Sequence, residues 1–178
     1  MRRLVRIVAV VVILLALGQW TKDTGEPGDR RGAYEGERGK IVRVVDGDTV
    51  RVRLQTGGEV TVRLIGIDTP ETKRPGTPVE CGGPAATANL ERLARGRITL
   101  DTDESQDVTD RYERLLAYVT NRQGVDLATA QLRAGWASTY VYDNQPFQRY
   151  GTYKSAQAAA RAGDHGVWAA CGGDFHKP

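Results

Sequence analysis

Asp46-Gly47-Asp48-Thr49 is followed, after a run of alternating residues, by Arg63-Leu64-Ile65-Gly66-Ile67-Asp68-Thr69-Pro70-Glu71. Residues 49–54 alternate between polar and apolar side chains, which is typical of a half-buried strand. Gly57-Gly58 predicts a hairpin turn, and residues 59–66 predict the returning strand. Pairing across this turn brings Asp48, at the start of one strand, near Asp68, beyond the end of the other. We therefore expect carboxylates to converge at one end of a hairpin.

The residue types at this end of the hairpin suit the cleavage of a phosphodiester. Such a reaction needs a proton acceptor, a cation and positive side chains around the phosphorus. Asp48 and Asp68 offer the hard oxygen ligands that Ca²⁺ prefers, with the backbone carbonyl of Thr69 as a third protein ligand. Glu71 follows a proline whose fixed φ stiffens the turn, and we assign it as the general base. Arg63 can present its planar guanidinium to phosphate oxygens.

These residues, together with three segments further along the chain, resemble the thermonuclease family of staphylococcal nuclease-like domains. Residues 71–75, Glu-Thr-Lys-Arg-Pro, are similar to the loop that follows the catalytic glutamate in that family, and Gly83-Pro84-Ala85-Ala86 resembles the start of its first helix. Residues 109–118 resemble the stretch that carries a second catalytic arginine. Tyr140-Val141-Tyr142 resembles the tyrosine pair beside the bound nucleotide. The resemblance covers roughly residues 40–168 and combines several motifs, which makes it specific.

The resemblance implies a five-stranded β-barrel of the oligonucleotide-binding (OB) type with three helices. It also implies an enzyme that uses Ca²⁺ to hydrolyse DNA and RNA and leaves 3′-phosphates. The residues that it assigns fall into three groups, which are the metal ligands Asp48, Asp68 and Thr69, the catalytic residues Arg63, Glu71 and Arg114, and the nucleotide-contacting residues Tyr112, Tyr140 and Tyr142. The alternative is a catalytically silent nucleic-acid-binding module on the same barrel, against which the intact carboxylates argue. For Tyr140 and Tyr142, which we place on one face of a strand, simple packing is the alternative.

The chain departs from the family pattern in two places. Glu113 and Leu115 stand where the staphylococcal pattern has glycines, so larger residues must adopt a backbone conformation that favours glycine. The carboxylate of Glu113 is also expected to compete for Arg114. Residues 101–107 form an acidic loop where the staphylococcal protein is basic, which predicts weaker affinity for polynucleotides. This loop lacks the glycine and glutamate of a helix-loop-helix calcium site, and we expect it to be solvated.

The N-terminus has a basic lead, residues 1–6, and an apolar run of 11 residues, 7–17. This run is shorter than the ~20 residues that span a bilayer, so residues 1–18 are interpreted as a signal peptide of a secreted protein. The alternative is an uncleaved anchor that displays the domain on the extracellular face. Loss of Arg2, Arg3 and Arg6 lowers the Lys+Arg count from 25 to 22, which equals the Asp+Glu count of 22. Attraction to nucleic acid must then come from local arginine placement, which favours a turnover enzyme over a tight binder.

The remaining pattern predicts one α+β domain. Residues 19–39 are rich in glycine and charge and predict a flexible linker, and the domain, a monomer by default, covers residues 40–171 before a C-terminal tail, 172–178. The elements expected are strands at 40–45, 48–54, 59–66, 97–102 and 114–120, a helix from about Pro84, a helix at 125–134, and a helix from about Pro146 to Gly163.

Two cysteines and both histidines complete the candidate residues. Cys81 and Cys171 are an even count in a chain with an export signal, which predicts a disulfide; two free thiols are the alternative. The bond would stabilise the fold by roughly 4 kcal/mol in the chain-entropy model. His165 and His176 lack a metal-ligand partner at a useful spacing, and we expect both to face solvent.

Overall fold

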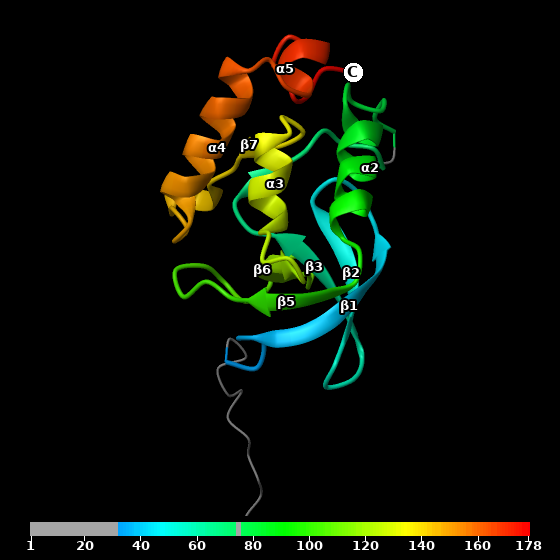
Figure 1. Ribbon diagram of the computed structural model, residues 1–178, viewed down its shortest axis with the longest axis vertical. Helices are drawn as coiled ribbons and strands as arrows, with labels where there is room; N and C mark the ends of the chain where they lie inside the picture. Colours follow the sequence, from blue (N-terminus) through cyan, green and yellow to red (C-terminus); the bar gives the residue numbers. More distant parts are fainter. Residues whose placement is uncertain (1–31, 74–75) are drawn as a thin grey trace, which may run out of the picture.

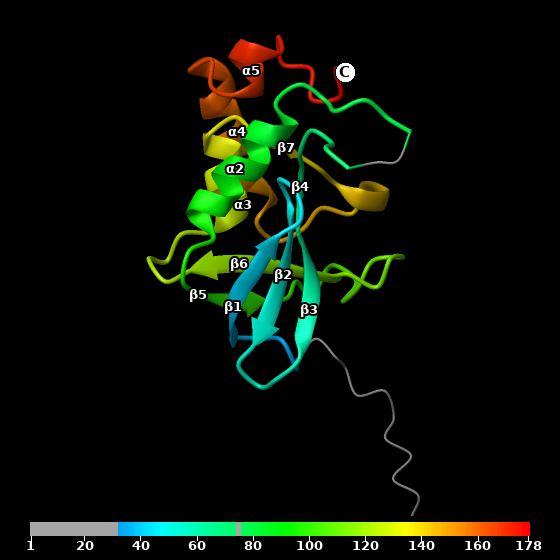
Figure 2. The same cartoon turned by 90° about the vertical axis from the view of Figure 1, so that its right-hand side faces the viewer.

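The computed structural model describes residues 32–73 and 76–178. Its centre is a closed β-barrel with the strand order β1-β2-β3-β6-β5, and helices α2, α3 and α4 lie together at one end of this barrel (Figures 1 and 2). The barrel strands are β1 (Glu37–Val44), β2 (Thr49–Leu54), β3 (Glu59–Leu64), β5 (Arg97–Asp101) and β6 (Leu115–Asn121). A second, two-stranded sheet pairs β4 (Ile67–Asp68) with β7 (Ser138–Thr139). The predicted α+β fold with an OB-type barrel is confirmed.

The alternation in β2 separates side chains that face the core of the barrel from side chains on its surface. Val50 and Val52 are fully buried inside, whereas Arg51 and Arg53 are exposed. The predicted hairpin is present, and the pairing of β2 with β3 sets Thr49 opposite Arg63. Strand β3 pairs on its other side with β6 in parallel. The start of β2, the end of β3 and the start of β6 therefore meet at the same end of the barrel.

The helices differ from prediction at their first residues. Helix α2 (Gly83–Leu93) begins with a proline in its first turn, as expected. Helix α3 (Leu127–Arg133) starts two residues late because Asp126 is its N-cap and accepts a hydrogen bond from the Thr129 amide. Helix α4 (Tyr150–Ala162) starts four residues after Pro146, since the preceding loop is held by other contacts. A 3₁₀ turn, η1 (Tyr142–Asn144), and a short helix, α5 (Val167–Ala170), complete the structure.

The first strand begins earlier than predicted. Residues 37–39, which we had placed in the linker, belong to β1, where Gly39 pairs with both Leu54 and Ile98. A Cβ at Gly39 would lie 2.7 Å from the carbonyl oxygen of Arg53, so glycine is needed for this close approach. The predicted signal peptide or anchor lies outside the described residues. In the part that is described, we find no helix with the length and apolarity to span a bilayer.

The predicted disulfide between Cys81 and Cys171 is confirmed, with Cα atoms 6.0 Å apart. It joins Cys81, two residues before α2, to the residue after α5, and Figure 1 shows the C-terminus beside the start of α2. Residues 172–178 are not a loose tail. Phe175 is buried and packs edge-on against Trp168 at 5.3 Å between ring centroids.

The acidic loop is not solvated throughout, which corrects our expectation. Asp103 is buried and accepts hydrogen bonds from the Ser105 hydroxyl, from the Tyr118 hydroxyl on β6 and from the Gln148 amide before α4. Burial alone would raise the pKa of Asp103, but these hydrogen bonds lower it below its ordinary value. Asp103 therefore ties the acidic loop to the barrel and to the segment that delays α4.

Replacing Asp103 with Ala should lower the free energy of unfolding by about 3 kcal/mol at pH 7, because buried donors lose a charged acceptor. The control Asp107→Ala, in the exposed part of the same loop, should change it by less than about 0.5 kcal/mol. Since the pKa of Asp103 is lowered on folding, its stabilisation is present above the unfolded-state pKa of about 3.9 and is lost as the pH falls through the folded-state value. Urea unfolding at pH 7 and pH 3 measures the free energy of unfolding and its dependence on pH. Equal stability of the two variants at pH 7 would contradict the expected role of Asp103.

Candidate functional site

A cavity of about 420 Å³ opens at the end of the barrel where β2 starts and β3 ends. Its walls come from the β1–β2 turn, from β3, from β4 and the residues after it, from the segment before α2, from the loop before β6 and from the C-terminal segment. The lining residues are Asp46, Asp48, Arg63, Asp68, Thr69, Pro70, Glu71, Glu80, Arg111, Tyr112, Arg114 and His176. Seven of the nine residues that the sequence proposed for the site lie in this cavity.

Arg63 lies between the two aspartates that the hairpin was predicted to bring together. One terminal nitrogen, Nη2, is 3.2 Å from Asp48 Oδ2 and 3.1 Å from Asp68 Oδ1. The other, Nη1, donates to the backbone carbonyls of Leu64 at 3.0 Å and Ile67 at 2.7 Å. The guanidinium is therefore fixed against the turn after β3. The expected convergence of Asp48 and Asp68 is confirmed.

Asp48 is the most firmly held of the carboxylates. It is buried, its Oδ1 accepts from the Thr49 hydroxyl at 2.9 Å, and its Oδ2 accepts from the Thr69 hydroxyl at 3.1 Å and amide at 3.3 Å. Asp46 lies two residues before it. Burial and the neighbouring charge of Asp48 raise the pKa of Asp46 to about 6. Burial also raises the pKa of Asp68, with a further contribution from Asp48 that opposes Arg63.

The donor set fits a hard divalent cation. Carboxylates are crowded in a half-buried place where Asp48 raises the pKa of both Asp46 and Asp68, and added positive charge would stabilise them. Within residues 32–73 and 76–178, no three His, Cys, Asp or Glu side chains are grouped so that all could hold one ion. The sequence predicts only two side-chain ligands, Asp48 and Asp68, completed by the Thr69 carbonyl and by waters. Their role as ligands stays a prediction.

Glu71 follows β4 and is held by backbone contacts on both sides. Its Oε1 accepts from the amides of Thr72 and Lys73, both at 2.8 Å. Its own amide donates to Glu80 Oε2 at 2.6 Å, and its carbonyl accepts from the Glu80 amide at 2.9 Å. The proposed base is thus placed by two reciprocal bonds to Glu80, a buried residue just before α2.

Arg114 reaches the cavity from the residue before β6. Its Nε donates to Asp110 Oδ2 at 2.6 Å, and its Cζ lies 5.3 Å from the centre of the Tyr112 ring. Burial would raise the pKa of Asp110, but the hydrogen bonds from Arg114 lower it. Asp110, and not Glu113 as we expected, is the carboxylate that pairs with Arg114. A guanidinium has five donor hydrogens, so this pairing leaves others for a phosphate.

The backbone conformation differs between Glu113 and Leu115, the two positions where the family pattern has glycines. Glu113 has a φ of +61°, which confirms that a non-glycine residue adopts the left-handed conformation here. Its side chain is exposed. Leu115, in contrast, is an ordinary buried residue at the start of β6. Only the first substitution therefore demands an unusual backbone.

Tyr140 and Tyr142 lie outside the set of residues that line the cavity. Strand β7 ends at Thr139 and Tyr142 begins η1, so our interpretation of one strand face is wrong. Both side chains are exposed, by 47% and 65%. The Tyr140 amide donates to the carbonyl of Gly66 at 2.9 Å, which holds this segment beside the turn between β3 and β4. Contact of these tyrosines with a nucleotide stays a prediction.

Five lining residues, among them Pro70, were not proposed as site residues from the sequence. Asp46 and Arg111 lie in stretches that the sequence analysis singled out, but neither was given a role there. Glu80 and His176 are 96 positions apart and show no spacing signal, since the folded C-terminal segment brings them together. His176 was expected to face solvent; its side chain is 65% exposed, but the ring also reaches Glu80 and Asp68.

Comparison with known proteins agrees with this geometry. The family described as staphylococcal nuclease homologue matches residues 61–170. The chain is 43% identical over 81 residues to a thermonuclease of Staphylococcus hyicus, covering 45% of the chain and 46% of the relative. It is 37% identical over 116 residues to a thermonuclease of Staphylococcus intermedius, covering 65% of the chain and 67% of the relative.

A third relative is the endonuclease YncB of Bacillus subtilis, which is 35% identical over 133 residues, or 73% of the chain and 61% of the relative. The chain spans about half to two thirds of the length of these three relatives. The matched region contains Arg63, Asp68, Glu71 and Arg114, which meet in one cavity. The chain belongs to the staphylococcal nuclease family.

Proposed function

We propose that this protein is a Ca²⁺-dependent nuclease that hydrolyses phosphodiester bonds of DNA and RNA. The observation that carries the proposal is the meeting of Arg63, Glu71 and Arg114 with the paired aspartates Asp48 and Asp68 in one cavity. The similar proteins are named thermonuclease or endonuclease, which supports the same activity. A cavity with fixed arginines and an acceptor carboxylate suits a turnover enzyme more than a silent binding module.

The arginines act on the phosphate. Arg63 is fixed by two backbone carbonyls and two carboxylates, and Arg114 by Asp110, so neither side chain needs to be ordered when the substrate arrives. Preorganised donors of this kind stabilise charge that develops on the phosphate oxygens in the transition state. When held by Asp48, Asp68 and the Thr69 carbonyl, Ca²⁺ would supply further positive charge there.

Glu71 acts as the proton acceptor. It takes a proton from a water molecule, the water oxygen bonds to phosphorus, and the bond from phosphorus to the 5′ oxygen breaks. The leaving 5′ oxygen takes up a proton, and the products are a 3′-phosphate and a 5′-hydroxyl. The ring of Tyr112 lies against the guanidinium groups of Arg111 and Arg114 and would contact the nucleotide that carries this phosphate.

We propose that the enzyme works outside the cytoplasm. The disulfide between Cys81 and Cys171 supports this because such bonds persist in oxidising compartments. Residues 1–18 would act as a secretion signal, and an uncleaved segment would instead keep the domain at the extracellular face of a membrane.

Removal of calcium tests the proposed function. Single-stranded DNA should be cleaved in Ca²⁺, left intact in a chelator, and cleaved again when excess Ca²⁺ is restored. Calcium at 100 times its Kd should also stabilise the folded protein by about 2.7 kcal/mol, and Asp68→Asn should reduce this shift. Binding of DNA without cleavage under every divalent metal would instead identify a silent module.

A further inference from the structure

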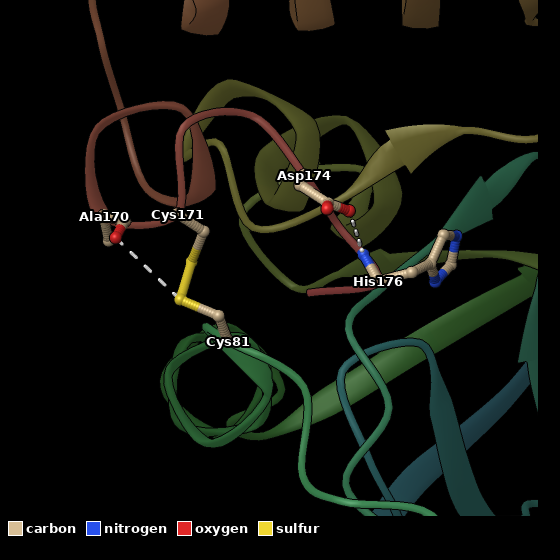
Figure 3. The surroundings of a disulfide bond; sticks show 5 residues. All are labelled: Cys81, Ala170, Cys171, Asp174 and His176. Carbon is tan, nitrogen blue, oxygen red and sulfur yellow. Dashed lines mark hydrogen bonds between the residues drawn. A yellow bond between two sulfur atoms is a disulfide. The ribbon is translucent and has the colours of Figure 1, made fainter. Parts of the chain in front are cut away.

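The C-terminal segment (residues 171–177) is attached at two points to Cys81, which directly follows the cavity residue Glu80. The disulfide joins Cys171 to Cys81, and the Cys81 amide donates to the carbonyl of Lys177 at 2.6 Å. Between these points, Phe175 is buried against Trp168, and the His176 amide donates to Asp174 Oδ1 at 3.0 Å. Figure 3 shows the disulfide and His176 on this one segment, with the His176 ring directed away from the sulfur atoms.

The His176 ring reaches the carboxylates of the cavity. Its Nδ1 is 3.4 Å from Glu80 Oε2, and its Nε2 is 3.7 Å from Asp68 Oδ2. The same oxygen of Glu80 accepts the hydrogen bond from the Glu71 amide at 2.6 Å. One carboxylate oxygen is therefore shared between the C-terminal segment and the backbone of the proposed base.

Residues 80 and 81 connect the C-terminal segment to the backbone of the proposed base. On one side, Glu80 holds the backbone of Glu71 by two hydrogen bonds. On the other, Cys81 holds the C-terminal segment by a covalent bond and a hydrogen bond. The Glu80 side chain is only 7% exposed, so its position depends on the groups packed around it.

We propose that the C-terminal segment, tethered by the disulfide, positions the general base through His176 and Glu80, which act as positioning residues. This inference rests on the proposed function, because it assigns a task to Glu71. A misplacement of about 1 Å in a reacting group can cost on the order of 100-fold in rate. A buried carboxylate that loses its partners on one side is free to move by such a distance and to carry the Glu71 backbone with it.

The test compares three variants with the wild-type full-length protein. Cys81→Ser/Cys171→Ser and His176→Ala should each lower kcat on single-stranded DNA by about 10-fold or more, with KM changed by less than about threefold. His176→Asn, whose side-chain amide can donate near the position of Nδ1, should recover most of the lost kcat. Rates are measured at a temperature where circular dichroism shows each variant folded.

A control and a second readout separate positioning from general loss of stability. Leu100→Ala removes volume from the barrel core away from the cavity, and the folded variant should keep the wild-type kcat. In calcium-free protein, amide hydrogen exchange should be faster at Glu71 in the disulfide-free variant and in His176→Ala, but unchanged in Leu100→Ala. Because the His176 side chain is exposed, its removal should leave the protein folded. If the cysteine variant does not fold, His176→Ala therefore tests the positioning role by itself.

The outcomes distinguish this inference from the proposed function. If wild-type protein cleaves DNA and Glu71→Gln does not, while His176→Ala keeps full kcat and normal exchange at Glu71, the positioning role is wrong and the nuclease assignment stands. If wild-type protein fails to cleave DNA, the proposed function is wrong, and unchanged exchange at Glu71 in His176→Ala would overturn the structural connection as well.

Discussion

Glu71→Gln is expected to lower kcat on DNA by about 10²- to 10⁴-fold, the range that a positioned general base contributes. The amide oxygen of glutamine can still accept the two hydrogen bonds that Glu71 Oε1 receives from the amides of Thr72 and Lys73. The backbone bonds to Glu80 do not involve the side chain of residue 71 and should persist. The variant should therefore fold normally while losing the proton acceptor.

The control for this variant is Glu91→Gln, which makes the same chemical change at an exposed position on α2. It should keep the wild-type kcat. Both variants are compared by initial rates in saturating Ca²⁺, with thermal unfolding to confirm equal stability. Full activity of Glu71→Gln would show that another group takes the proton, and the assigned role of Glu71 would be wrong.

Arg114→Lys is the second change with a large expected effect, a loss of about 100-fold or more in kcat. Arg114 donates from Nε to Asp110 while its guanidinium faces the cavity, so one planar group serves both the anchor and the substrate. Lysine has a single ammonium at the end of a flexible chain and cannot hold both in the same geometry. The loss should appear in kcat more than in KM, because the donors act on charge that develops in the transition state.

Arg53→Lys is a matched control, since Arg53 donates from Nε at 3.2 Å and from Nη2 at 2.8 Å to Glu59 on the exposed hairpin. This variant changes the arginine of a similar arginine–carboxylate pair that lies outside the cavity, and it should leave kcat unchanged. Steady-state rates on single-stranded DNA compare the two variants. Retention of the full rate by Arg114→Lys would remove Arg114 from the catalytic set.

One hairpin of the barrel could be predicted because its signals are local. Alternation in residues 49–54 and glycines at 57 and 58 determine a hairpin from neighbouring residues alone. A hairpin brings its two ends together independently of the rest of the chain. The proximity of Asp48 and Asp68 could therefore be predicted from the hairpin. The resemblance to a known family extended this to Arg114, which the β3–β6 pairing places at the same end of the barrel.

Other features depend on contacts between distant residues, which no local pattern reports. Asp103 looked like part of a solvated acidic loop, but its partners Tyr118 and Gln148 come from separate elements and bury it. The later start of α4 follows from the same contact. The partner of Arg114 was misjudged because the left-handed conformation of Glu113 turns the chain so that Asp110 faces the arginine.

The amino-acid sequence by itself determined the hairpin and the carboxylates at its end, because alternation, turn residues and residue chemistry act over short distances. The barrel was implied by the resemblance to a known family, and the cysteine pair by the even count of cysteines. Only the tertiary structure decided that His176 of the C-terminal segment lines the cavity and contacts Glu80, which in turn binds the backbone of the proposed base. The physical reason is that a disulfide between residues 90 positions apart and a small hydrophobic cluster around Phe175 place this segment, and both exist only once the whole chain has folded.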